Sequence, residues 1–224
     1  MLVQSLAALL LPALLSTAFP VDVAGDGDVH AEINTLGYLK CTATTSSGKS
    51  KVIGYVSRAL NSYGEYIGVS PSNNKDDVAA RMLVSIDLSL AENGTAQSLL
   101  VKNAPKNNYP FLGGIGGQEG SSIGSDGDYL LVGGTRETAT GAKPSYCGNT
   151  FTDARNILRK CSSAIWLFNT TSGLVTPQWV NDDGTAVVAN IGYTQGAFVF
   201  TGDKKTFEDT WNQDVDWITL SLDN

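Results

Sequence analysis

Three glutamates are the residues best suited to acid–base chemistry: Glu65, Glu119 and Glu137. Hydrolysis of a glycosidic bond needs two carboxyl groups flanking the bond and requires no histidine. Glu119 lies in a glycine-rich stretch, but no spacing in the sequence pairs it with another glutamate. Glutamates also serve as ordinary solubilising charges on protein surfaces. The sequence therefore leaves a glycan-active hydrolase open, with its catalytic pair unknown.

Histidine-dependent chemistry would depend on a single residue, His30. A Ser-His-Asp or Cys-His site would have to use it, and one imidazole cannot supply a His-rich metal centre. We therefore expect His30 to be a surface residue. The glycine-rich stretch 113–120 lacks the spacing of a dinucleotide- or phosphate-binding loop. Tight turns, or close approach of neighbouring strands, explain its glycines better.

Two carboxylate clusters raise the question of calcium: Asp26-Gly27-Asp28 and Asp182-Asp183-Gly184. Carboxylates on a turn suit a hard cation, but neither cluster continues as an EF-hand. Counted from Asp26, the positions that need glycine and glutamate hold Ala31 and Gly37. Asx-type turns account for both clusters. We expect no metal and no cofactor.

Aromatic residues indicate binding rather than catalysis. Protein sites for sugars pair an aromatic ring, on which the sugar stacks, with polar groups that fix its orientation. Trp179 is followed by Asn181, Asp182 and Asp183 at the end of an expected strand, and these four are the candidate ligand-binding residues. Strand aromatics also commonly fill the core. The other aromatic residues considered are Tyr38, Tyr55, Tyr63, Tyr66, Trp166, Tyr193 and Trp211.

The chain has three cysteines, Cys41, Cys147 and Cys161. In an oxidising compartment a pair is expected to bridge, and the short segment between Cys147 and Cys161 makes them the expected disulfide. Cys41 alternates in phase with Leu39 and Ala43, which is typical of a buried thiol. The bridges from Cys41 to either other cysteine remain alternatives. The spacing fits no zinc site.

Residues 1–18 read as a signal peptide, because an apolar run is followed by the small residues Ser16 and Ala18. We expect cleavage after Ala18 and a single β-rich domain over residues 19–224. Two acceptor sequences for N-glycosylation begin at Asn93 and Asn169, both at expected hairpin tips. These features predict a secreted, extracellular glycoprotein.

Composition narrows the class of partner. The 224 residues carry a net charge of -7 with no basic block, which disfavours nucleic acid and anionic membranes. Abundant glycine and frequent β-branched and aromatic residues favour short strands joined by tight turns. After removal of the signal peptide we expect no membrane association. Extracellular or cell-wall glycans are the expected partners.

Hydrophobic alternation predicts an antiparallel β-sandwich or barrel of about ten strands. We expect two short helices, one capped by Thr152 and ending near Cys161, the other over 204–211 capped by Asp203. The expected strands cover residues 35–44, 51–60, 78–90, 98–102, 128–133, 163–168, 174–180, 186–194, 197–201 and 216–222.

Four short blocks of the sequence resemble a group of small secreted fungal proteins with no established activity. These blocks are Ser163-Ala164-Ile165-Trp166, the stretch 174–184, Gly54-Tyr55-Val56-Ser57 and the stretch 109–114. The resemblance implies secretion and a β fold, and it transfers no site residue.

Three functions remain open from the sequence. The favoured one is a secreted, non-enzymatic extracellular or cell-wall-associated protein that binds carbohydrate. The second is a glycan-active hydrolase with two carboxylates, and the third is a structural extracellular protein without a small ligand. An exposed aromatic platform beside amide or acid groups would favour the first. A pocket holding two carboxylates about 5–10 Å apart would favour the second.

Overall fold

The computed structural model describes residues 33–44, 48–70 and 75–224, which belong to one compact unit, Glu32–Asn224. The expected signal peptide, His30 and Asp26-Gly27-Asp28 lie outside the described residues. Among the described residues, no helix is long and apolar enough to cross a membrane.

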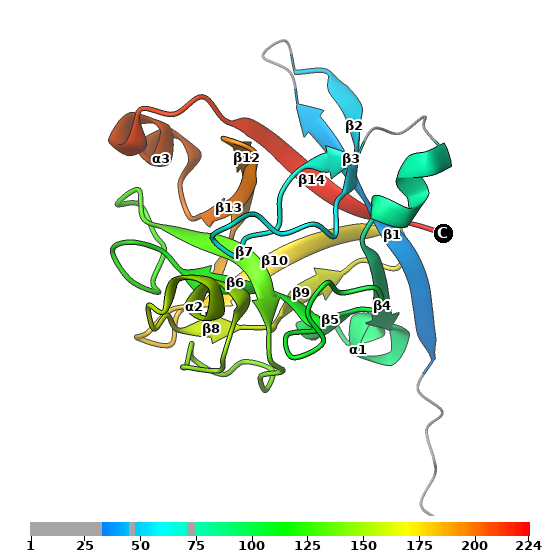
Figure 1. Ribbon diagram of the computed structural model, residues 1–224, viewed down its shortest axis with the longest axis horizontal. Helices are drawn as coiled ribbons and strands as arrows, with labels where there is room; N and C mark the ends of the chain where they lie inside the picture. Colours follow the sequence, from blue (N-terminus) through cyan, green and yellow to red (C-terminus); the bar gives the residue numbers. More distant parts are fainter. Residues whose placement is uncertain (1–32, 45–47, 71–74) are drawn as a thin grey trace, which may run out of the picture. The chain divides into compact units, whose positions relative to one another are not determined.

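Antiparallel strands dominate the fold, as the sequence predicted. All strand pairs for which a register is defined are antiparallel, so neighbouring strands in the sheet run in opposite directions (Figure 1). The strands are β1 (Asn34–Thr44), β2 (Ser50–Val56), β3 (Val69–Ser70), β4 (Leu83–Asp87), β5 (Gln97–Val101), β6 (Phe111–Gly116), β7 (Tyr129–Thr135), β8 (Cys161–Ser162), β9 (Ala164–Phe168), β10 (Leu174–Val180), β11 (Ala186–Val188), β12 (Asn190–Thr194), β13 (Ala197–Thr201) and β14 (Asp216–Asp223).

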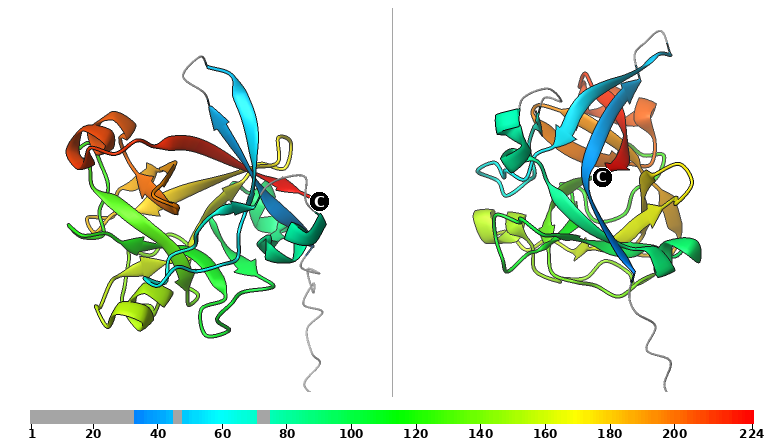
Figure 2. Two further views of the ribbon diagram at one scale, coloured as in Figure 1. Left: turned by 45° about the horizontal axis from the view of Figure 1, so that its top comes forward. Right: turned by 90° about the vertical axis from the view of Figure 1, so that its right-hand side faces the viewer.

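Eight strands close into a barrel. The ring of pairings runs β1, β4, β5, β6, β7, β13, β12 and β14, and it returns to β1 through six residue pairs between β14 and β1. Closure leaves none of these strands as a free sheet edge over its paired length. The β9–β10 hairpin joins β5 to β14, and β2 and β3 extend the sheet from β1. In Figures 1 and 2, β1 and β2 project beyond the rest of the sheet.

Two tryptophans on the β9–β10 hairpin fill the core. Trp166 and Trp179 are at most 1% exposed, and Trp166 meets Phe200 of β13 edge-on with ring centroids 5.6 Å apart. Their indole N–H groups donate to the backbone oxygens of Leu112 and Ser121, so neither polar group is buried without a partner. The hairpin is therefore fixed both by packing and by hydrogen bonds.

Glycines in β6 make room for this packing. A Cβ atom on Gly114 would lie 2.7 Å from the Trp179 ring, and one on Gly113 would lie 2.6 Å from the backbone oxygen of Ser162. The sequence suggested close approach between strands for these glycines, and this is confirmed. It did not predict that residues 111–116 form a strand, because three glycines in six residues weaken the strand pattern.

Three α-helices are described rather than the two expected: α1 (Leu88–Glu92), α2 (Thr150–Arg155) and α3 (Lys204–Trp211), with a 3-10 turn over Lys75–Ala80. The bounds of α3 and its cap were predicted correctly. The Asp203 side chain accepts from the Thr206 N–H, and Asn212 ends the helix in the left-handed conformation.

The strand expected over residues 78–90 ends early, at Asp87. The Asp87 carboxylate accepts from the N–H groups of Ser89 and Leu90, which starts α1 where the alternating pattern continues. Asn93 consequently lies at the C-terminal end of a helix rather than at a hairpin tip.

The second helix also differs from its prediction. Asn149, not Thr152, caps α2, and Asn156 ends it in the left-handed conformation well before Cys161. Ile157 and Leu158 therefore lie outside the helix and are 45% and 73% exposed.

Candidate functional site

A groove with a volume of about 280 Å³ lies between β7, β13 and α3. Figures 1 and 2 show α3 beside the β12–β13 hairpin. Aromatic rings and uncharged amides dominate the lining of this groove, together with one carboxylate. We call it the aromatic groove. Its lining residues are Asn61, Tyr63, Glu65, Tyr129, Leu131, Thr194, Gln195, Ala197, Val199, Phe207, Trp211 and Gln213.

The rings on the α3 side are locked to one another. Tyr129 meets both Phe207 and Trp211 edge-on, with centroids 5.8 and 5.1 Å apart. The Trp211 indole N–H donates to the Gly127 backbone oxygen at 2.9 Å. Because Phe207 and Trp211 are four residues apart on α3, both rings lie on the same face of the helix. The groove wall is therefore preformed.

A short turn, residues 61–65, supplies another part of the groove lining. Asn61 accepts through Oδ1 from the N–H groups of Tyr63 and Glu65, and its Nδ2 donates to the Glu65 carboxylate at 2.6 Å. Gly64 has a φ of 80°, and a Cβ atom there would lie 2.2 Å from the Thr150 backbone oxygen. Glycine is thus required for this turn to dock against the start of α2.

Tyr63 is the most exposed ring of the groove, with 47% of its surface accessible. The Arg155 guanidinium lies 4.5 Å from its ring centroid. Such a cation–π contact restricts the ring without burying it. The Arg155 contact thereby holds the most exposed ring of the groove lining.

Charged groups of both signs lie near Tyr129. Burial, followed by the nearby charge of Glu65, raises the pKa of the Tyr129 phenol; the Arg159 guanidinium opposes this shift, and Glu119 adds a smaller contribution to it. Burial and the charges of Asp126 and Glu119 raise the pKa of Asp128 in the same region. Glu65 places a negative charge in the lining of the groove, and this charge disfavours an anionic ligand.

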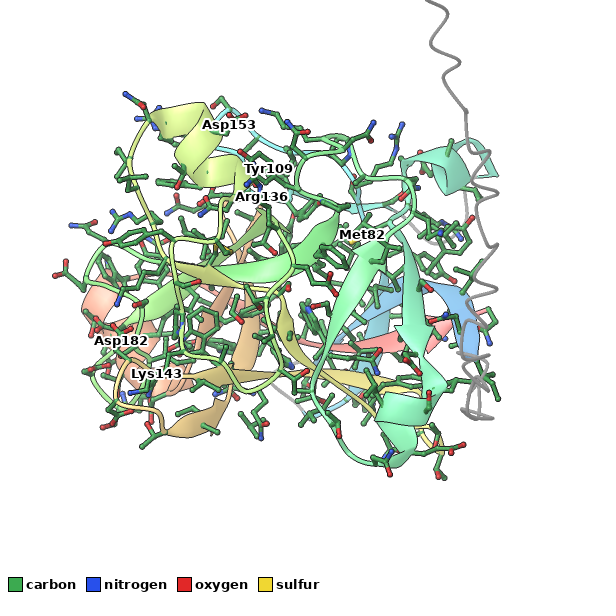
Figure 3. The ribbon with its side chains drawn as sticks, turned by 90° about the horizontal axis from the view of Figure 1, so that it is seen from below. Met82, Tyr109, Arg136, Lys143, Asp153 and Asp182 are labelled. Atoms are coloured by element: carbon green, nitrogen blue, oxygen red, sulfur yellow. A yellow bond between two sulfur atoms is a disulfide. The ribbon has the colours of Figure 1, made fainter. Side chains whose placement is uncertain are left out.

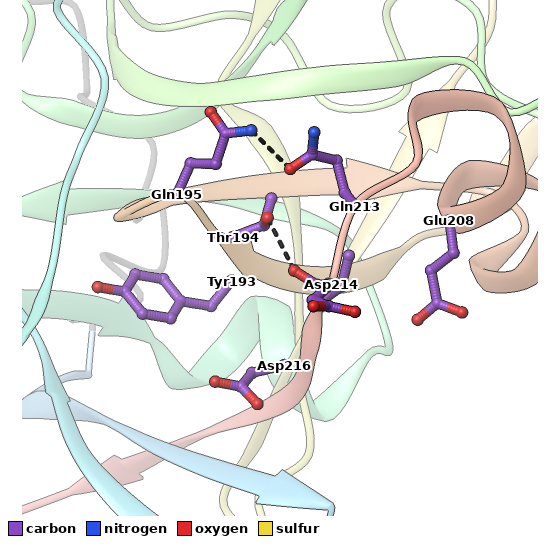
Figure 4. Close-up of a pocket in the computed structure, with 8 residues that line it drawn as sticks. Tyr193, Thr194, Gln195, Glu208, Gln213, Asp214 and Asp216 are labelled. Atoms are coloured by element: carbon purple, nitrogen blue, oxygen red, sulfur yellow. Dashed lines mark hydrogen bonds between the residues drawn. The ribbon is translucent and has the colours of Figure 1, made fainter.

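A second hollow of about 490 Å³ adjoins the groove (Figure 4). We call it the outer pocket; it is lined by Tyr193, Thr194, Gln195, Glu208, Gln213, Asp214, Val215 and Asp216. Glu208 accepts from the Trp217 indole at 2.7 Å, and the Thr194 hydroxyl donates to the Asp214 backbone oxygen at 2.9 Å. Polar contacts therefore hold the lining of this pocket in place.

The four residues predicted to bind ligand do not form a shared surface. Trp179 is completely buried, so its ring supports the core and is not available to stack on a ligand. Asn181 exchanges hydrogen bonds with both backbone groups of Ile123. Asp183 closes an Asx turn onto the Thr185 N–H, as the turn alternative predicted.

Of the four, Asp182 lines one of the described hollows. The carboxylate pairs with Lys160 at 2.8 Å and accepts from Ser121. The hydrogen bond from Lys160 keeps the pKa of the Asp182 carboxyl below its usual value. Lys143, which lies beside Asp182 in Figure 3, adds to this effect. The hollow, about 180 Å³, includes Tyr146, which is 66% exposed.

The three candidate glutamates are dispersed. Glu65 lines the aromatic groove, Glu119 lies near enough to influence Tyr129, and Glu137 is exposed after β7. Of these three glutamates, Glu65 alone lines one of the described hollows.

One serine motif was overlooked in the sequence. Gly120-Ser121-Ser122-Ile123-Gly124 matches the Gly-x-Ser-x-Gly pattern of hydrolases, which requires a turn between a strand and a helix. Here residues 117–128 are irregular, and the Ser122 hydroxyl accepts from the Asp182 N–H. The structural context of a nucleophile is therefore missing.

The disulfide between Cys147 and Cys161 is confirmed, and it closes a segment with a sequence separation of 14. Cys41 is free and buried, also as predicted, and burial raises the pKa of its thiol to about 12. In the described part of the chain, no group of three or more His, Cys, Asp or Glu residues could hold a metal ion.

Both glycosylation acceptors are exposed. Asn169 lies at the five-residue tip of the β9–β10 hairpin, where its Oδ1 accepts from Thr171 and Ser172. Asn93 ends α1 and donates to the Ser89 backbone oxygen. Their occupancy stays a prediction.

Comparison with known proteins gives no relative. No protein-family model matches the chain, and neither a curated protein nor a solved structure matches it. The function must therefore be argued from the groove itself.

Proposed function

We propose that this is a secreted, non-enzymatic extracellular protein that binds a neutral carbohydrate in the aromatic groove. The observation that carries the proposal is a groove lined by the preformed wall of Tyr129 and Trp211, the exposed ring of Tyr63, amides and one carboxylate. Apolar rings with a few oriented polar groups are the general chemistry of small-ligand sites.

The charge of the groove supports a neutral ligand. Among the described residues that line the aromatic groove and the outer pocket, none is a lysine or arginine. Glu65 contributes negative charge in the groove, and the chain as a whole carries -7. Uronic-acid or sulfated glycans would be repelled by this field, whereas hydroxyl groups can bind to Asn61, Gln195 and Gln213.

The test is a glycan-array screen of the protein purified from the medium of a secreting host, followed by calorimetry on the strongest hit. Tyr63→Ala should weaken binding about tenfold, because one lost stacking contact is worth about 1 kcal/mol. Tyr146→Ala is the matched control: it removes another exposed tyrosine, one from the Asp182 hollow. The proposal fails if the array shows no binding, or if only Tyr146→Ala reduces it.

A hydrolase with two carboxylates is the second candidate. The observation that favours it is the Glu65 carboxylate in the groove lining, with Glu119 near enough to act on Tyr129 of the same groove. Incubation of the bound glycan with wild-type protein should then release new reducing ends, and Glu65→Gln should abolish the release. Binding without release would leave the non-enzymatic function.

A further inference from the structure

The aromatic groove and the outer pocket share one wall. Thr194, Gln195 and Gln213 line both hollows. At the boundary the Gln195 Nε2 donates to the Gln213 Oε1 at 2.5 Å, and the two amides face each other in Figure 4. The division between the hollows is thus a pair of polar side chains rather than packed core.

This amide pair is fixed to the aromatic wall. Gln213 Nε2 donates to the backbone oxygen of Trp211 at 3.2 Å. Within the described chain, the Gln195 Oε1 has no protein hydrogen bond, and each NH₂ group carries a second hydrogen. The pair can therefore bind hydroxyl groups of a ligand without giving up its own contacts.

The backbone at Gln195 points to the same conclusion. Gln195 and Gly196 have φ values of 49° and 79° and form the tight turn between β12 and β13. Asn-Gly is the sequence that such a turn prefers, and glutamine has no local reason to adopt this conformation. Local rules are most often broken where a side chain has a functional role.

Size gives the third argument. At about 280 Å³ the aromatic groove lies just below the roughly 300–1,000 Å³ of typical small-ligand sites. Joined to the outer pocket of about 490 Å³, it lies well inside that range. A ligand confined to the groove would use only the smaller part of the hollow.

From the shared wall, the fixed amides and the combined size, we infer that the two hollows form one extended site, crossed by a linear neutral oligosaccharide. The oligosaccharide stacks on the rings of the aromatic groove, passes over the Gln195–Gln213 pair and continues into the outer pocket. This rests on the proposed function, and it adds that the protein recognises internal stretches of a glycan rather than single sugars or short ends.

The test is the dependence of affinity on chain length. Dimers and hexamers of β-1,4-linked N-acetylglucosamine and of β-1,3-linked glucose are titrated into the wild-type protein by calorimetry. In the series that binds, the hexamer should bind at least tenfold more tightly than the dimer. Equal affinities would overturn the extended site while leaving the proposed function intact. If no oligomer of any glycan binds, the proposed function fails as well.

Two variants test whether the Gln195–Gln213 pair causes the dependence of affinity on oligosaccharide length. Gln195→Asn keeps a residue suited to the turn but shortens the amide, and Gln213→Ala removes its partner. Each should weaken hexamer binding at least fivefold and dimer binding less than twofold. Gln178→Ala, on β10 and outside both hollows, is the matched control. Hexamer binding that is unchanged in both variants, with unchanged circular dichroism, would overturn the inference.

Discussion

The ring of Trp211 meets the ring of Tyr129 edge-on, with centroids 5.1 Å apart and planes at 86°. This contact joins the last turn of α3 to the first residue of β7, two segments far apart in the sequence. The indole N–H is simultaneously held by the Gly127 backbone oxygen. One side chain thus positions α3 and forms part of the aromatic groove.

Replacing Trp211 should therefore affect stability as well as binding. Trp211→Ala is expected to lower the free energy of unfolding by about 2 kcal/mol, from the lost aromatic contact and the lost hydrogen bond. Trp211→Phe keeps a ring but no N–H donor, so it should cost about half as much. Urea denaturation monitored by circular dichroism measures both. Equal losses in the two variants would show that the ring contact contributes little.

Cys41 should be chemically inert in the folded protein. The thiol is completely buried on β1, and burial raises its pKa to about 12. At pH 8 only about one thiol in ten thousand is ionised, and the thiolate is the reactive form. Iodoacetamide at pH 8 should leave the native protein unmodified, whereas one thiol per chain should react in guanidinium. Rapid labelling of the native protein would contradict the buried position.

Processing can be tested on the secreted protein. N-terminal sequencing should begin at Phe19, because Ser16 and Ala18 fit a signal-peptidase site. Enzymatic deglycosylation of protein from a eukaryotic host should lower its mass and convert Asn93 and Asn169 to Asp. An N-terminus at Met1, or an unchanged mass, would count against the corresponding prediction.

Strands with one polar and one buried face were predictable from the sequence. The bounds of β10 and β13, the cap of α3 and the disulfide follow from alternation, capping chemistry and cysteine spacing. The closure of the barrel was not predictable, since it depends on the pairing of β1 with β14, near opposite ends of the chain. Strand β6 was missed because its contacts require glycines.

The candidate site shows where sequence reasoning stops. Trp179 followed by polar residues has the right composition for a sugar site, but the strand phase turns its ring into the core. Tyr63 and Trp211 were noted only as scattered aromatics, because only the tertiary fold brings them to the same groove. Gln195 gave one usable signal: it precedes a glycine between two alternating strands, where Asn is usual.

The last prediction concerns the contact between the two ends of the barrel sheet. Asp223 of β14 accepts from the Lys40 ammonium at 2.7 Å and from the Tyr55 hydroxyl at 2.6 Å. The hydrogen bonds from Lys40 and Tyr55 hold the pKa of Asp223 below its usual value of 3.8. A carboxyl whose pKa is lower in the folded state stabilises the fold above its unfolded pKa. That contribution is lost as the pH falls below about 4 and through the folded value.

Asp223→Asn should accordingly lower the free energy of unfolding at pH 7 by about 1 kcal/mol, a modest effect because the ion pair is partly exposed. As the pH falls below 3.8 and through the folded pKa, the variant and the wild type should converge, because the wild-type carboxyl becomes protonated as well. Asp209→Asn is the matched control, since its ion pair with Lys205 joins residues within one exposed helix. Urea denaturation from pH 2.5 to 7 measures the difference. A constant gap between Asp223→Asn and the wild type over this range would show that the carboxylate charge does not stabilise the fold.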